Sequence, residues 1–218
     1  MTILALEFSS PQRSVAVLRA GDATVAAEVI ESGGSGTNTF GMIEKVLAEA
    51  KLEREQIETI AVGLGPGSYT GIRVALSVAQ GWQLARGVKL LGLSSADCLA
   101  AQAQTEGIFG CVNVMVDAQR NEFYLATYET SADGWNSIEP LRILTLREVQ
   151  LRAEAREILV GPEVTRWFPD GRTIFPRAAT LTRLVVERNS FVAGERLEPI
   201  YLREVNFAKA TGRKSAAL

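Results

Sequence analysis

Gly65-Pro66-Gly67-Ser68-Tyr69-Thr70-Gly71-Ile72-Arg73-Val74 is the stretch that decides the fold. It follows an apolar run, Ile60 to Leu64, whose length and β-branched content predict a buried strand. It opens into a segment, Gly71 to Arg86, that we predict to be a helix. Glycine adopts positive φ readily and proline fixes φ, so the three glycines and the proline indicate a tight backbone path. We expect positive φ at Gly67, and Ser68 or Thr70 as the helix N-cap.

The spacing of this loop does not by itself name a ligand. A glycine loop that leads into a helix N-terminus is a natural place for an anion or for the carboxylate of a partner. The alternative is a strand-to-helix turn that needs glycine only for close packing. No lysine follows as in a P-loop, and the dinucleotide pattern G-x-G-x-x-G is absent.

Length and composition predict a globular protein of one large domain or two ordinary ones, with 218 residues of which 47% are hydrophobic. The net charge of −2 argues against a chain that binds nucleic acid by itself, because such binding depends on clustered Lys and Arg. Cys98 and Cys111 form no metal or redox spacing, and we interpret them as reduced, buried thiols. We see no signal-peptide pattern and no apolar run of the ~20 residues that span a membrane, so we expect a cytoplasmic protein without membrane contact.

The chain contains no histidine. This removes Ser-His-Asp and Cys-His catalysis and every metal site that uses histidine. A carboxylate-only site for a hard cation remains open, but no D-x-D-x-D-G loop supports one.

The first half of the chain predicts a β-meander followed by β-α-β-α-β, which is typical of a mixed sheet covered by helices. Glu7 lies at the end of the first strand, where it is either an edge-exposed carboxylate or a site residue. The expected strands are Ile3 to Phe8, Ser14 to Arg19, Thr24 to Ile30, Glu58 to Leu64 and Lys89 to Leu93, and the expected helices are Thr39–Ala50 and Gly71–Arg86.

A polar stretch at Gln104 to Gly107 marks the expected boundary between two lobes, and Ser94 is the expected N-cap of the helix before it. We assign residues 1–105 to an N-terminal lobe, 106–206 to a C-terminal lobe and 207–218 to a flexible tail. In the second lobe the expected strands are Cys111 to Val116, Glu122 to Tyr128 and Ile158 to Gly161, and the expected helices are Thr145 to Ala155 and Leu181 to Glu187.

The helix after the glycine loop carries two stripes of small residues. Gly71, Ala75 and Ala79 form one, and Ser77, Gly81 and Ala85 form the other. Small residues let a facing backbone approach closely. One stripe is explained by packing on the sheet of the chain itself, and the second suggests another helix on the other side. The alternative is a helix buried between its own sheet and a neighbouring element of the same chain.

Four segments in order resemble the TsaB (YeaZ) family nearly position for position. They are Gly65–Arg73, Gly92–Ser95, Asp117–Tyr124 and Pro199–Arg203. The resemblance spans residues 2 to about 205. The nine-residue signature is specific, and the ordered set of four is more so. The fold it implies is the actin/Hsp70/sugar-kinase (ASKHA) type, an α/β fold of two related lobes, each a mixed β-sheet flanked by helices.

The resemblance also implies a function. Bacterial members of the family help to make threonylcarbamoyladenosine at position 37 of tRNAs that read codons beginning with A. By resemblance the chain is a non-catalytic partner of TsaD, which binds the metal and transfers the threonylcarbamoyl group. A small ATPase, TsaE, joins the pair with ATP, and tRNA is contacted only through the complex. The isolated chain would then hold no cofactor, and we expect it to form a homodimer.

The sites that follow from the resemblance and the two stripes are a structural loop, a second-lobe motif and a partner interface. The structural loop is Gly65, Pro66, Gly67, Ser68, Tyr69, Thr70, Gly71 and Arg73. The second-lobe motif is Asp117, Arg120, Glu122 and Tyr124. The interface is Phe40, Ile43, Leu47, Gly71, Ala75, Ser77, Val78, Gly81, Trp82 and Ala85.

The chain differs from related proteins in two places, and two rival functions remain open. TsaD-like enzymes hold their metal with two histidines on the first helix of this fold, whereas Ser35 to Ile43 contains none. Glu7 stands where the family usually has aspartate, which puts a nucleotide role at that position in doubt. One rival is an ATP-dependent phosphotransferase, for which Asp117 is the candidate acid. The other is a metallopeptidase, against which the lack of histidine argues.

Overall fold

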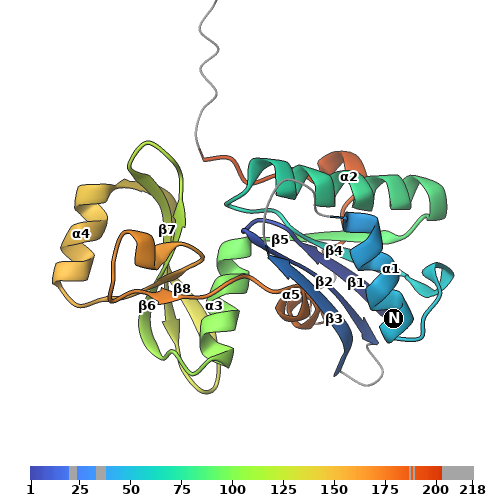
Figure 1. Ribbon diagram of the computed structural model, residues 1–218, viewed down its shortest axis with the longest axis horizontal. Helices are drawn as coiled ribbons and strands as arrows, with labels where there is room; N and C mark the ends of the chain where they lie inside the picture. The colour runs from blue at the N-terminus through green and yellow to red at the C-terminus, as the bar shows by residue number, and fades with distance from the viewer. Residues whose placement is uncertain (20–23, 33–37, 187, 189, 203–218) are drawn as a thin grey trace, which may run out of the picture.

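A computed structural model of the protein describes residues 1–19, 24–32, 38–186, 188 and 190–202. Figure 1 shows two β-sheets side by side, with helix α3 between them. The first sheet has the strand order β3-β2-β1-β4-β5. Its first three strands form an antiparallel meander, and β4 and β5 run parallel to β1. Its strands are β1 Thr2–Glu7, β2 Gln12–Arg19, β3 Thr24–Ser32, β4 Thr59–Gly63 and β5 Lys89–Leu93.

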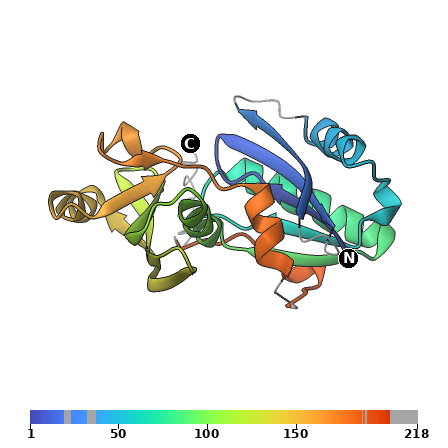
Figure 2. The ribbon, with the colours of Figure 1, turned by 90° about the horizontal axis from the view of Figure 1, so that it is seen from below.

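Both faces of the first sheet are covered by helices, which explains why its central strands are apolar without alternation. Leu4 and Leu6 point to the face covered by α1 and α2. Ile3 and Ala5 point to the opposite face, which α5 covers. Figure 2 shows α5 and α1 on opposite sides of this sheet. These helices are α1 Thr39–Glu49, α2 Tyr69–Arg86 and α5 Ala178–Val186.

The second sheet repeats the mixed architecture, with the order β10-β9-β6-β7-β8. β6, β7 and β8 are antiparallel, whereas β9 and β10 extend the sheet in parallel. The helix α4 packs on one face and α3 on the other. The elements are β6 Gly110–Asp117, β7 Glu122–Thr130, β8 Trp135–Thr145, β9 Ile158–Gly161, β10 Arg172–Thr173, α3 Ser95–Thr105 and α4 Leu146–Glu154. Three short 3₁₀ helices complete the described chain: η1 Arg54–Gln56, η2 Val164–Arg166 and η3 Gly194–Arg196.

The chain returns to the first sheet after completing the second. α5 contacts β1 and β2, and its preceding residue Arg177 forms an ion pair with Glu28 of β3. The segment after α5 then crosses to α2, where Gln80 donates to the carbonyl of Gly194 at 2.8 Å. Residues assigned from the sequence to the C-terminal lobe therefore contribute to the core of the N-terminal lobe. The domain bounds themselves stay a prediction.

The predicted fold class, two mixed sheets flanked by helices, is confirmed. The meander, the two helices of the first half and the third helix with its Ser94 cap are also present. α2 begins at Tyr69, two residues earlier than expected, because Ser68 is its N-cap. Of the two cysteines predicted to be buried, Cys98 is buried, whereas Cys111 near the start of β6 is exposed. The predicted tail 207–218 and most of the loop predicted between Glu31 and Thr39 lie outside the described residues. Across the described part of the chain, none of the helices combines the length and the apolar character that a membrane crossing demands.

Candidate functional site

The glycine loop is fastened to two other segments by backbone hydrogen bonds. The amide of Ser68 donates to the carbonyl of Ser9 at 2.7 Å, and the amide of Ser95 donates to the carbonyl of Gly65 at 2.8 Å. Gly65 and Gly67 have φ of 93° and 146°, which confirms the positive φ expected at Gly67, and the Gly65–Pro66 peptide is cis. The loop therefore joins the end of β1, the start of α2 and the start of α3 in one compact junction.

Two glycines at this junction are required by close backbone approach. A Cβ on Gly67 would lie 2.0 Å from the carbonyl oxygen of Ser9, and a Cβ on Gly71 would lie 2.0 Å from that of Phe8. Both distances are far below van der Waals contact, and a carbonyl in a packed backbone has little room to move. The glycines thus let α2 begin directly against the end of β1. The interpretation that the loop needs glycine for packing is correct for these two positions.

Glu7 lies beneath this junction and is completely buried. Its Oε1 accepts a hydrogen bond from the Ser9 amide at 2.8 Å, and its Oε2 accepts one from the Ser95 hydroxyl at 3.0 Å. Burial raises the pKa of the Glu7 carboxyl above its usual value of 4.5, although the hydrogen bonds from Ser9 and Ser95 oppose the rise. Glu7 does not line the cleft between the lobes. Its position supports a role in holding the junction and not in contacting a ligand.

The buried Glu7 predicts a specific pH dependence of stability. Because its pKa is higher in the folded chain, its contribution is fully present below its usual pKa of 4.5 and is lost as the pH rises through the folded-state pKa. Glu7→Gln keeps the length of the side chain but cannot ionise. As the pH rises from 4.5 through the folded-state pKa, the Tm of the wild type should therefore fall relative to the Tm of Glu7→Gln. Thermal unfolding followed by circular dichroism checks this, and a difference that does not change with pH would contradict it.

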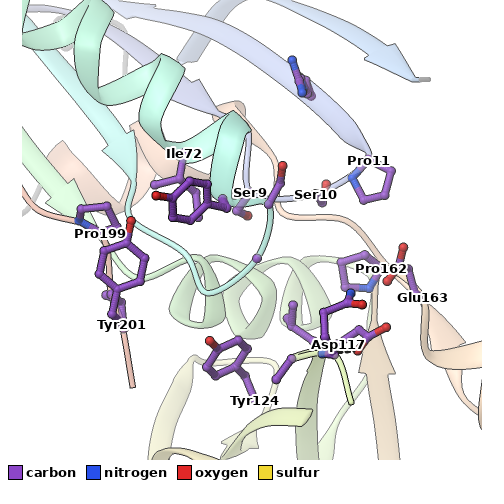
Figure 3. Close-up of a pocket in the computed structure, with 18 residues that line it drawn as sticks. Ser9, Ser10, Pro11, Ile72, Asp117, Tyr124, Pro162, Glu163, Pro199 and Tyr201 are labelled. Carbon is purple, nitrogen blue, oxygen red and sulfur yellow. Dashed lines mark hydrogen bonds between the residues drawn. The ribbon is translucent and has the colours of Figure 1, made fainter. Parts of the chain in front are cut away.

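A cleft of 600 Å³ lies between the two lobes. Figure 3 shows Ser9 and Ser10 on one side of it and Asp117 and Tyr124 on the other, with Tyr201 toward one end. Of the predicted second-lobe motif, Asp117 and Tyr124 line the cleft, whereas Arg120 and Glu122 do not. The wall on the first lobe includes Gly67, Ser68 and Tyr69 of the glycine loop.

The turn between β6 and β7 has an unusual backbone. Gln119, Arg120 and Asn121 are three consecutive residues other than glycine with positive φ, at 65°, 61° and 59°. This conformation is uncommon for such residues and costs free energy at each of them. The turn is held by Asp117, whose Oδ1 accepts a hydrogen bond from the Gln119 amide at 2.7 Å. The predicted motif therefore includes one residue, Asp117, that both shapes the turn and lines the cleft.

A second hollow, of 740 Å³, lies over α1, α2 and η1, and we call it the α1/α2 groove. Seven of the ten residues predicted for the partner interface line it. They are Phe40, Ile43, Ser77, Val78, Gly81, Trp82 and Ala85. The remaining lining residues are Arg54, Glu55, Tyr69, Thr70, Arg73, Val74 and Arg86.

The other three predicted interface residues, Leu47, Gly71 and Ala75, lie in the core of the chain itself. Leu47 and Ala75 are buried between the two helices and the sheet, and Gly71 abuts the backbone of Phe8. This placement corrects their assignment: they belong to the layer that supports the groove and not to its surface. The stripe Gly71-Ala75-Ala79 is thus explained by packing on the sheet. The second stripe, Ser77-Gly81-Ala85, lines the groove.

Apolar side chains in the groove and beside it are open to solvent. Phe40 at the start of α1 is 65% exposed and Leu84 on α2 is 89% exposed. Leu84 follows Ser77 by two helical turns and so lies on the same side of α2. A Cβ added to Gly81 would meet nothing within 4 Å. Within the described chain, this part of α2 has therefore no covering element.

The sequence did not indicate the aromatic and cationic cluster at the edge of the groove. The guanidinium of Arg73 lies over the ring of Tyr69, 3.9 Å from its centroid, and its Nε donates to the hydroxyl of Tyr201 at 3.0 Å. The two tyrosine rings are 6.2 Å apart. Tyr69 lines both the groove and the interlobe cleft, so the cluster separates the two hollows. Tyr201 lies 128 positions after Arg73, so only the fold brings them together.

Comparison with known proteins gives consistent results. A protein-family model described as TsaD, tRNA N6-adenosine threonylcarbamoyltransferase, matches residues 36–201. The tRNA threonylcarbamoyladenosine biosynthesis protein TsaB of Escherichia coli is 26% identical over 98% of this chain and 100% of its own length. The TsaB of Bacillus subtilis is 28% identical over 59% of this chain and 56% of its own length.

A solved structure titled YeaZ from Pseudomonas aeruginosa superposes with a TM-score of 0.78 at 25% identity and covers 92% of this chain and 99% of that one. A second Pseudomonas aeruginosa structure, titled as an uncharacterized protein with similarity to peptidase YEAZ, gives 0.79 at 25% identity, over 93% and 99% of the two chains. Since the match to the family model covers more than half of the chain and includes the glycine loop, the α1/α2 groove and all strands of the second sheet, the chain belongs to the family of the threonylcarbamoyltransferase model and, within it, to the TsaB (YeaZ) family.

Proposed function

We propose that this chain is a non-catalytic subunit of the complex that adds the threonylcarbamoyl group to adenosine 37 of tRNAs reading codons that begin with A. Its partner in this proposal is TsaD, which docks on the α1/α2 groove. The observation that carries the proposal is the groove itself, an apolar hollow between two helices with a solvent-exposed stripe of small residues. The names of the TsaB relatives, which place those proteins in tRNA threonylcarbamoyladenosine biosynthesis, support the process.

The physical case for docking is the cost of leaving this surface in water. Phe40, Tyr69 and Leu84 are exposed side chains of large apolar area, and they lie on or beside the groove. Contiguous apolar patches of this kind usually mark an interaction site. The small residues Ser77, Gly81 and Ala85 form a floor on which a helix of the partner can approach α2 closely. When TsaD is absent, the same surface is the one through which we propose that the chain forms a homodimer.

The non-catalytic part of the proposal rests on the composition. The chain has no histidine, and no cluster of three or more Cys, Asp or Glu side chains suited to a metal is found among the described residues. We therefore place the metal on TsaD and ATP on the partner subunits, with TsaE joining the pair and tRNA reached through the complex. The small negative net charge fits a cytoplasmic subunit that does not hold tRNA alone.

Reconstitution tests this proposal. The chain is purified alone and with TsaD of its own organism, and threonylcarbamoyladenosine is measured in tRNA after adding TsaE and ATP. We expect a stoichiometric complex with TsaD, modification that requires the chain, and neither bound metal nor ATP turnover by the chain alone. ATP turnover by the chain alone would favour the phosphotransferase, for which the interlobe cleft is the site. Failure to bind TsaD would reject the subunit proposal.

A further inference from the structure

Arg73 is held in one place by groups around it, although it lies at the surface. The Tyr69 ring lies under its guanidinium at 3.9 Å, and the Tyr201 ring is 5.9 Å away. Its Nε donates to the Tyr201 hydroxyl at 3.0 Å. A guanidinium stacked on a ring and tied through Nε has lost much of its freedom before any partner arrives, and this lowers the entropic cost of binding one.

The charge of Arg73 has no acidic partner in the described part of the chain, unlike the other two arginines of the groove. Arg54 forms an ion pair with Glu44 at 2.6 Å, and Arg86 forms one with Glu55 at 3.2 Å. Among the described residues, the hydrogen bond and the ring contacts of Arg73 are with the two tyrosines, and the hydrogen bond uses Nε, so the two terminal nitrogens of the guanidinium take no part in it. The pair of terminal N–H groups is the donor arrangement that binds a planar carboxylate through two parallel hydrogen bonds.

We propose that Arg73 receives a carboxylate from the helix of the partner that docks in the α1/α2 groove. This inference rests on the proposed docking function and names the chemistry by which the groove recognises its occupant: an apolar helix face with one Asp or Glu at the end near Tyr69. Apolar contact over Phe40, Val78 and Trp82 gives such a helix its area. The single unpaired cation at the edge sets its direction and register, because a helix placed the other way round would leave Arg73 without a partner.

The position of Arg73 at the groove favours a protein carboxylate over a phosphate of RNA. The floor next to it is apolar, with Val74, Val78 and Trp82, whereas phosphate backbones are bound on surfaces with several cations. The two other cations of the groove are already neutralised by Glu44 and Glu55. One unpaired charge beside an apolar floor fits one carboxylate on an amphipathic helix.

Tyr201 is a positioning residue in this arrangement. It belongs to the segment after η3, which is fixed by the hydrogen bond from the Ile200 amide to the Leu64 carbonyl at 2.9 Å. Its hydroxyl orients Arg73 through Nε, and its ring stands beside the ring of Tyr69. The last described segment of the chain thus contributes to a surface otherwise built by the first lobe. Tyr201→Phe keeps the ring but loses the hydroxyl, and Tyr201→Ala loses both.

Binding of TsaD from the same organism, measured by titration calorimetry at two salt concentrations, tests the inference. We expect Arg73→Gln to weaken binding by about 10- to 100-fold and to reduce the salt dependence of the affinity. Arg73→Lys keeps the charge but lacks the two parallel N–H donors. Its loss of binding free energy should therefore be about half of the loss in Arg73→Gln. Tyr201→Phe should weaken binding less than Tyr201→Ala. Circular dichroism confirms that each variant is folded.

Arg166→Gln is the matched control, because Arg166 also lies over an aromatic ring, that of Trp167 at 5.6 Å, but stands on the second lobe away from the groove. It should bind like the wild type. A wild-type chain that fails to bind TsaD rejects the docking function. A wild type that binds, together with a folded Arg73→Gln variant of equal affinity, overturns the carboxylate inference alone. The inference is also overturned if Arg73→Gln leaves TsaD binding intact and weakens only the binding of tRNA to the complex, since Arg73 would then serve a phosphate.

Discussion

Gly67→Val is expected to lower the free energy of unfolding by about 3 to 5 kcal/mol, a large effect for a single substitution. Two causes act together. The residue has φ of 146°, where a β-branched side chain is strained, at a cost of about 1 to 3 kcal/mol. Its Cβ would also lie 2.0 Å from the carbonyl oxygen of Ser9, which accepts the Ser68 amide. The valine must push this carbonyl away and break the bond that joins the loop to the end of β1.

Thermal unfolding of the isolated chain measures this effect. A chain of this length should melt about 10 °C lower in the Gly67→Val variant. Gly81→Ala is the matched control for stability, since a Cβ at this helical glycine meets nothing within 4 Å. It should raise the free energy of unfolding by about 0.5 to 1 kcal/mol through helix propensity. A Gly67→Val variant that melts within a degree of the wild type would show that neither strain nor close approach constrains the loop.

The contrast between these two glycines shows how far the sequence alone could go. Gly-Pro-Gly after an apolar strand indicates a tight loop, so positive φ at Gly67 was predictable from local chemistry. Local chemistry does not say what lies behind a glycine. Gly71 and Gly81 belong to the same helix and to two similar stripes, yet one abuts the backbone of Phe8 and the other is open. Which stripe faces the sheet depends on the rotation of α2, and the capping residue Ser68 and the packing of Ile72 set that rotation together.

Long-range contacts could not be predicted from the sequence pattern either, because local chemistry does not say which distant segments pack together. The fold class followed from the order of strands and helices, and the sheet topology agrees with it. The strand β8 was missed because polar residues interrupt its apolar ones and it contains Pro140, which is tolerated at the edge of a sheet. The return of α5 to the first sheet depends on contacts such as Arg177 with Glu28, 149 positions apart. The cluster of Tyr69, Arg73 and Tyr201 likewise joins residues that no periodicity connects.

Gly81→Arg is expected to abolish docking on the α1/α2 groove while leaving the isolated chain folded. Gly81 lies in the groove and is open on its outer side, so an arginine there projects into the hollow without a clash within the chain. A facing helix would be held away from α2, and any closed arrangement would bury an added charge. The burial of a poorly paired charge costs about 3 to 5 kcal/mol, which corresponds to a loss of at least about 100-fold in affinity.

Pull-down with TsaD and sedimentation of the chain alone measure the two consequences. Because we propose that the same surface serves the homodimer, Gly81→Arg should be monomeric at concentrations where the wild type is dimeric. Gly134→Arg is the matched control, since Gly134 is also open but lies between β7 and β8 on the second lobe, outside the groove. It should retain both associations. If a folded Gly81→Arg protein binds TsaD at wild-type strength, the partner does not contact this stripe. The exposed side chains of Phe40 and Leu84 would then need a different covering element.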